Sequence, residues 1–262
     1  MKNIFFSLLF FSSIMYSQQN MNILFHANYE LKFKEYKNLE KADINTFVLL
    51  FNNKESYFKN STIYVKDSLI DSGKIKYNDT QDDLNINMMY YTNFPYTVYK
   101  KGNEINFANE LPYSGELRYI ETVNFDWKIT KEIKKIKGFD CIKATTTKWG
   151  RKWTAYFSPN HPMPFGPYKF HGLPGLIFEV SDEKNDYNFT LYRFRNRKKN
   201  NVILHNYPKA KKVTKEQYTK SRHDDAVHPF ESFIKDEPDM PKKILKMKIE
   251  KEKNYNSIEL TE

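Results

Sequence analysis

Three polar residues in the middle of this chain are of types that could do chemistry: His171, Asp126 and Arg151. Histidine and carboxylate groups exchange protons, and arginine stabilises developing negative charge. If the three met in an open pocket, they could serve a hydrolase. The alternative is a buried polar cluster in which Asp126 pairs with Arg151 and His171 bonds to the backbone. The sequence gives no sign that the three converge, so the buried cluster is the preferred interpretation.

A glycine- and proline-rich hexapeptide follows His171 directly. Glycine adopts backbone conformations that are closed to other residues, and proline fixes one φ angle. A loop that passes close to another backbone needs this pattern whether or not a ligand binds, so an architectural role is preferred over a ligand cradle. No G-K-[ST] follows the glycines, which argues against a phosphate loop. The candidate loop residues, with one nearby tryptophan, are Gly172, Leu173, Pro174, Gly175 and Trp153.

A second group of polar residues could in principle hold a metal ion. Histidine and carboxylate side chains are suitable zinc ligands. Their spacing here does not match H-E-x-x-H, and the segment is interpreted as an exposed loop before Pro229. Incidental clustering is preferred, and neither a metal nor a cofactor is expected. The residues are His223, Asp224, Asp225 and His228.

Cys141 is the only cysteine of the chain. A single thiol cannot form an internal disulfide, and no local protease signature surrounds it. The preferred interpretation is a buried apolar filler within a strand, because free cysteine is among the most buried residue types. An intermolecular bridge and a reactive thiol are the alternatives.

Four motifs occur in a fixed order through this region: F-D-W at 125–127, G-F-D-C-I-K-A at 138–144, G-R-K-W-T-A-Y-F at 150–157 and G-P-Y-K-F-H-G-L-P-G-L-I at 166–177. Together they closely resemble the GLPGLI family of exported proteins from Bacteroidetes-type bacteria, although Phe139 stands where tyrosine is common. The resemblance implies export, an envelope or extracellular setting and a β-rich fold. It brings no established activity, cofactor or catalytic residue to this chain.

The first residues have the layout of a secretory signal peptide. Lys2 supplies a positive start, residues 4–15 are almost wholly apolar, and Ser17 precedes a polar stretch. We therefore expect residues 1–17 to be a signal peptide and residues 18–262 to be one β-rich domain with a basic, partly ordered C-terminal segment. No later apolar run approaches the length of a transmembrane helix. The expected location is the periplasm, the outer membrane surface or the exterior.

The elements that must position these residues are mostly strands. Residues 23–33 alternate between apolar and other side chains, a period typical of a strand with one buried face. A loop is predicted at 68–83, and an irregular crossing loop at 159–175, which holds five of the eleven prolines. Glycine turns at 101–103, 137–138 and 149–150 predict hairpins. Further strands are expected at 46–51, 56–58, 62–65, 86–91, 96–99, 105–107, 116–121, 127–136, 141–148, 152–157, 176–180, 187–194 and 202–204.

Helices are expected only near the C-terminus. Thr214 and Gln217 form a capping box that predicts a helix over 215–222, and 241–253 has the composition of a partly ordered helix or tail. The sequence therefore predicts a mainly β fold with a single antiparallel, strongly curved sheet and one or two short C-terminal helices. A half-barrel is preferred over a sandwich-like arrangement.

The formal net charge of +10 is spread along the chain rather than focused. Export would separate the protein from chromosomal DNA, so no nucleic-acid partner is expected. The preferred hypothesis is an exported, non-enzymatic protein that binds a partner protein or an apolar or anionic ligand on the concave face of its sheet. The alternative is an envelope hydrolase that uses His171 with Asp126 and Arg151.

Overall fold

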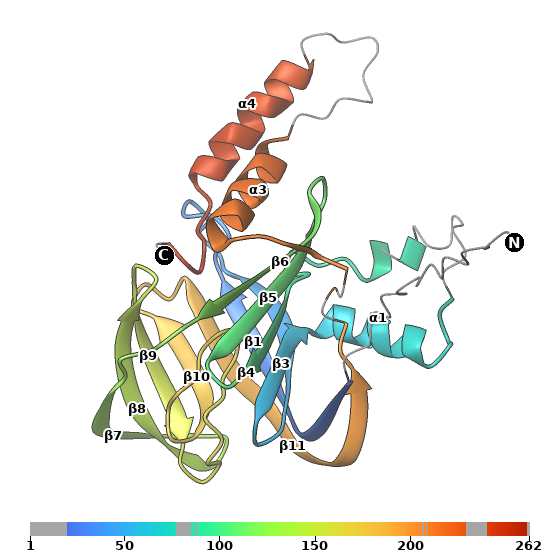
Figure 1. Cartoon of the computed structure of the whole chain (residues 1–262). Coiled ribbons are helices and arrows are strands. Elements are labelled where there is room, and N and C mark those ends of the chain that lie inside the picture. The colour runs from blue at the N-terminus through green and yellow to red at the C-terminus, as the bar shows by residue number, and fades with distance from the viewer. Residues whose placement is uncertain are drawn as a thin grey trace, which may run out of the picture.

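The protein is mainly β, and twelve strands form one open, mixed sheet in this computed structural model (Figure 1). The structure describes residues 20–76, 85–86, 88–205, 207, 209–228 and 240–260. The strands are β1 (Asn20–Phe33), β2 (Asp43–Phe51), β3 (Glu55–Asn60), β4 (Thr97–Lys101), β5 (Glu104–Leu111), β6 (Gly115–Thr122), β7 (Lys128–Ile136), β8 (Phe139–Lys148), β9 (Arg151–Ser158), β10 (Leu176–Asp182), β11 (Tyr187–Ile203) and β12 (Lys211–Lys212). Their order across the sheet is β12-β6-β5-β4-β3-β2-β1-β11-β10-β9-β8-β7. Neighbouring strands are antiparallel except β12 and β6, which are parallel.

Three helices whose bounds lie within the described residues accompany the sheet: α1 (Ser61–Asp71), α3 (Lys215–Val227) and α4 (Met240–Lys253). Figure 1 shows α3 and α4 side by side, projecting from one end of the sheet, whereas α1 lies near the end of β11. The predicted capping box is present at Thr214 and Gln217. Within the described part of the chain, none of the helices combines the length and the apolar character needed to cross a membrane.

The predicted alternation in residues 23–33 produces β1, in which Ala27, Tyr29 and Leu31 are fully buried. The predicted hairpin turns are also present. Lys137, Gly138, Trp149 and Gly150 all have positive φ angles, and two such residues in succession form the turns that match the twist of antiparallel strands.

Two predicted strands are wrong. Residues 62–65 lie in α1, which also includes residues 68–71 of the predicted loop. Asn60 caps this helix through its side chain, which accepts a hydrogen bond from the Thr62 amide at 2.9 Å. Residues 86 and 88–89 are also helical. The predicted signal peptide and residues 77–83 of the predicted loop lie outside the described residues.

The two faces of the central strands differ in chemistry. The strand register places Ala27, Leu49 and Phe58 in one cross-strand row of an apolar face, which the crossing segment (residues 159–175) covers. The adjacent row, on the opposite face, includes His26 and Tyr57. That second face, which we call the polar face, combines these polar groups with the buried Leu50 and Val48. It is partly covered by α1, through Tyr64 against His26, and it is the face on which a polar ligand could bind.

Candidate functional site

The hexapeptide after His171 carries the chain from the crossing segment into β10. Gly172 has a φ of +90° and open space where a Cβ would be. Gly175 is needed for a different reason, because a Cβ there would lie 2.2 Å from the Ser158 carbonyl oxygen at the end of β9. A turn conformation accounts only for Gly172, whereas Gly175 meets the other expectation from the sequence, a loop that passes close to another backbone. Leu173 is buried between them, and Pro174 is exposed.

His171 is buried beside the hexapeptide. Its Nδ1 atom lies 2.8 Å from the Lys169 carbonyl oxygen, and its ring meets Phe125 edge-on with centroids 5.4 Å apart. Burial lowers the pKa of His171 to about 4, so the ring is neutral at pH 7. The predicted bond to the backbone is therefore present. None of the contacts of this ring with described residues involves a carboxylate.

We expect His171 to make folding stability depend on pH. The pKa of His171 is about 4 when folded and 6.5 when unfolded, so the unfolded chain binds the extra proton between these values. The free energy of unfolding then falls as pH drops from 6.5 towards 4, by about 2 kcal/mol at pH 5. Measured by urea unfolding, the free energy of unfolding of His171→Gln should differ less between pH 7 and pH 5 than that of the wild type does. His223→Gln, at an exposed histidine, is the control, and an undiminished pH effect in His171→Gln would contradict this role.

Asp126 and Arg151 do not form the predicted pair. Asp126 is exposed, whereas the Arg151 side chain is buried and lies 2.9 Å from Asp182. Trp153 is also buried, and its indole nitrogen donates to the Lys148 carbonyl oxygen at 3.0 Å. Arg151, Trp153 and His171 contact surrounding parts of the fold rather than one another.

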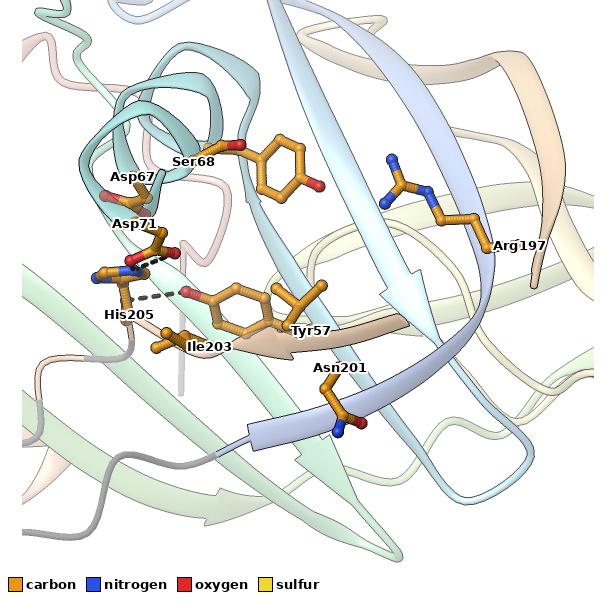
Figure 2. Close-up of a pocket in the computed structure, with 10 residues that line it drawn as sticks. Tyr57, Asp67, Ser68, Asp71, Arg197, Asn201, Ile203 and His205 are labelled. Atoms are coloured by element: carbon orange, nitrogen blue, oxygen red, sulfur yellow. Dashed lines mark hydrogen bonds and ion pairs between the residues drawn. The ribbon is translucent and has the colours of Figure 1, made fainter. Parts of the chain in front are cut away.

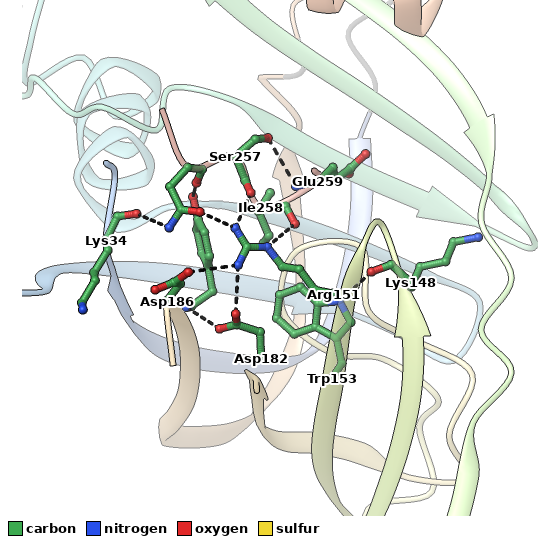
Figure 3. A network of polar contacts seen from close by, with 11 residues as sticks. Lys34, Lys148, Arg151, Trp153, Asp182, Asp186, Ser257, Ile258 and Glu259 are labelled. Atoms are coloured by element: carbon green, nitrogen blue, oxygen red, sulfur yellow. Dashed lines mark hydrogen bonds and ion pairs between the residues drawn. The ribbon is translucent and has the colours of Figure 1, made fainter. Parts of the chain in front are cut away.

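Arg151 is the centre of a buried polar network that holds the C-terminal strap, which we define as residues 254–260 (Figure 3). Its guanidinium donates to the Asn256 side chain at 2.7 Å and to the Ser257 and Ile258 carbonyl oxygens at 2.6 and 3.2 Å. With Asp182 also bound, the guanidinium nitrogens all donate to residues of the fold. Arg151 therefore has little capacity left for a substrate.

A second buried cation, Lys169, holds the same strap. Its ammonium group donates to Glu259 at 2.6 Å and to the Tyr119 hydroxyl at 2.9 Å, and it also pairs with Glu121. Burial acts to raise the pKa of Glu259, but Lys169 and Lys215 outweigh this effect and hold it below 4.5. The strap is thus fixed by two charged groups from the motif region. The Arg151 side of the strap borders a second cavity, of about 500 Å³, which Asp182, Asn256 and Leu260 also line.

The predicted metal-binding residues lie at the end of α3 and not in a loop. Asp225 accepts hydrogen bonds from the Tyr113 and Ser114 amides at 2.7 and 3.1 Å, while His228 stacks on Tyr113. The described residues include no cluster of three or more potential metal ligands. Cys141 is buried and free, as predicted, and burial raises the pKa of its thiol to about 11.

A cavity of about 400 Å³ lies on the polar face, between α1 and the end of β11 (Figure 2). We refer to it as the α1–β11 cavity. Its volume falls within the range of small-molecule sites, about 300–1,000 Å³. The residues that line it include Tyr57, Tyr64, Asp67, Ser68, Asp71, Arg197, Asn201 and His205.

The acidic side of the cavity is internally paired. His205 Nε2 lies 2.9 Å from Asp71 Oδ1, and Asp67 pairs with Lys59. Burial lowers the pKa of Lys59 even though Asp67 acts in the opposite direction. The Tyr57 hydroxyl donates to the His205 carbonyl oxygen at 2.8 Å, which ties the chain after β11 to β3.

The opposite side of the cavity carries an unpaired cation. Figure 2 shows Arg197 across the cavity from Asp71 and His205. Arg197 is half-buried and makes no hydrogen bond or ion pair with any residue that the structure describes. Nearby on β1, His26 is buried, and its Nε2 atom has no hydrogen-bond partner. Burial, followed by the charges of Arg197 and its neighbours on β11, lowers the pKa of His26 to about 4.

Sequence reasoning missed this site for two local reasons. Arg197 belongs to a basic run at 193–199 that resembles an ordinary solvated surface. Asp67 and Asp71 are four residues apart and share a side of α1, but residues 62–65 of this helix were predicted as a strand and residues 68–71 as part of a loop. A helical interpretation of residues 61–71 would have placed the two carboxylates together.

Comparisons with known proteins identify a similar fold but no sequence relative. No protein-family model matches the chain, and neither does any curated protein sequence. The structures of PNGF-II in the P21 and C2 space groups are similar, with TM-scores of 0.56 and 0.53 and 12% identity in both cases. The matches cover 78% of this chain but only 34% and 33% of the PNGF-II chains. The chain therefore spans about a third of PNGF-II, and the likeness is one of fold alone.

Proposed function

We propose that this chain is an exported, non-enzymatic protein of the GLPGLI family that binds a small anionic molecule in the α1–β11 cavity. The four ordered motifs at 125–177 support the family assignment. The leader pattern at 1–17 supports export to the periplasm, the outer membrane surface or the exterior. Its removal would leave a mature chain that begins at Gln18.

The observation that carries the binding proposal is the unpaired guanidinium of Arg197. A half-buried charge loses hydration, and proteins normally compensate for this loss with an opposite charge. Arginine presents a planar set of donors that matches a carboxylate or phosphate group. The arginines on β11 also increase the positive potential around this group. An anionic ligand would supply the missing partner of Arg197.

The other walls suit a ligand that is polar as well as charged. Ser68 and Asn201 offer a hydroxyl and an amide, and neither side chain has a polar partner among the described residues. The Tyr64 ring adds an apolar surface. Because Asp71 is already bound by His205, the acidic side can accept a ligand hydroxyl without presenting an isolated carboxylate. Phosphorylated or carboxylated sugars are small molecules with this combination of groups.

We also infer that the sheet is strongly curved into a half-barrel around the crossing segment. Lys169 in that segment contacts Tyr119 on β6, and the adjacent Phe170 packs against Trp153 on β9 with ring centroids 4.7 Å apart. Seven strands separate β6 from β9 in the sheet. In a flat sheet these two strands would lie about 38 Å apart. Aromatic side chains and the crossing segment fill the apolar face inside this curve, so we propose the ligand on the opposite face and not on the concave one that the sequence suggested.

Calorimetric titration of the mature chain with inorganic phosphate and with D-glucuronate tests the proposal. We expect saturable binding of at least one of these anions, no binding of neutral glucose, and at least about tenfold weaker binding to Arg197→Gln, because a charge-assisted hydrogen bond contributes about 1.5–3 kcal/mol. Arg193→Gln removes the same charge from an exposed position on the same strand and should bind almost as wild type does.

Three results would contradict the binding site. They are a failure of both anions to saturate the wild-type protein, an unchanged affinity of Arg197→Gln, and a loss of affinity in Arg193→Gln as large as that in Arg197→Gln. The last result would assign binding to the net charge of β11 rather than to the cavity.

A further inference from the structure

The strand β7 ends the sheet opposite β12, and no strand of the described chain pairs with its outer edge. The strand is nine residues long, and eight of the nine are exposed. Backbone donors and acceptors along such an edge are free to pair with another extended chain. Soluble proteins protect such edges by shortening or covering them, or with lysines and bulges. The strand β7 carries lysines and a bulge, so the feature that requires an explanation is its exposed apolar residues.

The apolar face of the sheet continues onto β7. Ile129 is in register with Ala144, and Ile133 with Ile142, on either side of a bulge. The row that contains Ile142 continues into the buried Phe157 on β9. Despite this alignment with the core, Ile129 and Ile133 are 51% and 62% exposed. A strand added beside β7 would bring apolar side chains into the same rows and cover both residues.

The charge of the edge limits what can be added. Lys128 and Lys131 are exposed, and neither forms an ion pair with a described residue. Lys134 pairs with Glu179 on β10, and Lys135 lies 3.7 Å from Asp140. The free charges of this edge are therefore positive.

We propose that β7 is a docking edge for an extended, acidic segment of another protein, which adds a strand to the sheet. The backbone of that segment would bond to β7, its apolar residues would cover Ile129 and Ile133, and its carboxylates would lie near Lys128 and Lys131. This is the strand-addition mode of peptide recognition. A second copy of this chain fits poorly, because two such edges would place lysines opposite lysines between molecules of net charge +10.

The test uses a fluorescein-labelled nine-residue peptide that alternates glutamate and valine, with an alternating lysine–valine peptide for comparison. Fluorescence anisotropy with the mature protein should show saturable binding of the acidic peptide only. Lys128→Glu combined with Lys131→Glu should weaken this binding at least tenfold. The matched control, Lys211→Glu with Lys212→Glu, makes the same charge change in β12 at the opposite edge and should leave binding unchanged.

Hydrogen exchange distinguishes strand addition from simple charge attraction. With the acidic peptide bound, amides of β7 should exchange more slowly, whereas those of β12 should not change. The proposal is overturned if the acidic peptide does not bind saturably, if the β12 variant loses as much affinity as the β7 variant, or if β7 gains no protection. A wild-type dimer in solution with β7 already protected would also overturn it, because the occupant would then be a second copy.

Discussion

Replacing Gly175 with alanine is expected to destabilise the protein by at least about 3 kcal/mol, which is large for the addition of one methyl group. The new Cβ would lie 2.2 Å from the Ser158 carbonyl oxygen and 2.8 Å from its carbonyl carbon. Both atoms belong to the backbone, so no side-chain rotation relieves the overlap. The strands β9 and β10 would have to separate where Leu176 pairs with Ser158. Urea unfolding followed by circular dichroism measures the effect, and Gly175→Val should be worse still.

Gly172→Ala is the matched control for this change. Gly172 needs its positive φ angle but has open space around it, so alanine should cost only about 1–2 kcal/mol. Asparagine tolerates this conformation better than alanine does, so Gly172→Asn should recover part of the loss, whereas Gly175→Asn should recover none. A wild-type unfolding midpoint for Gly175→Ala would show that the two strands are not held as closely as the structure indicates.

The strands could be predicted because their signals are local. Residues 23–33 alternate over the full length of β1, and the pairs at 137–138 and 149–150 lie at the turns of the β7–β8 and β8–β9 hairpins. Each signal depends on neighbours within a few residues, and no distant contact opposes it. The capping box at Thr214 is equally local, and it located the start of α3 correctly.

The helix α1 shows where local signals conflict. Thr62, Ile63 and Val65 are β-branched and favour a strand, but Asn60 caps the first turn of a helix. The burial of Ile63 and the pairing of Asp67 with Lys59 then hold this helix against the sheet. These tertiary contacts override intrinsic propensity. Because α1 forms one wall of the cavity, the wrong prediction of a strand at residues 62–65 also prevented the sequence from indicating the candidate site.

The partners of the motif residues could not be predicted because they are distant in sequence. Arg151 was correctly expected to be buried with a carboxylate, but that carboxylate is Asp182, and another partner, Asn256, lies 105 residues away. Any of the chain's 32 acidic residues could have been the partner. The partners of Arg151 are determined only by the order of strands β9, β10 and β11 and by the position of the strap beside them.

Arg151→Met is expected to destabilise the protein by about 3–5 kcal/mol, because removing one partner of a buried ion pair leaves the other charge without compensation. Asp182 would remain buried, and its other contact, with the Tyr187 amide at 2.8 Å, cannot replace the guanidinium. The Ser257 and Ile258 carbonyl oxygens would lose their donor as well. Urea unfolding gives the loss of stability, and hydrogen exchange should show faster exchange throughout the strap.

Arg151→Lys and Lys152→Met separate charge from geometry in this prediction. Lysine keeps the positive charge but lacks the planar set of donors. Arg151→Lys should therefore lose less stability than Arg151→Met, but hydrogen exchange in the strap should still be faster than in the wild type. Lys152 is the next residue, and its pair with Glu183 is exposed on both sides, so Lys152→Met should change stability by less than about 1 kcal/mol. If Arg151→Met left the strap as protected as in wild type, Lys169 and its carboxylates would be sufficient to hold it, and the role assigned to Arg151 would be wrong.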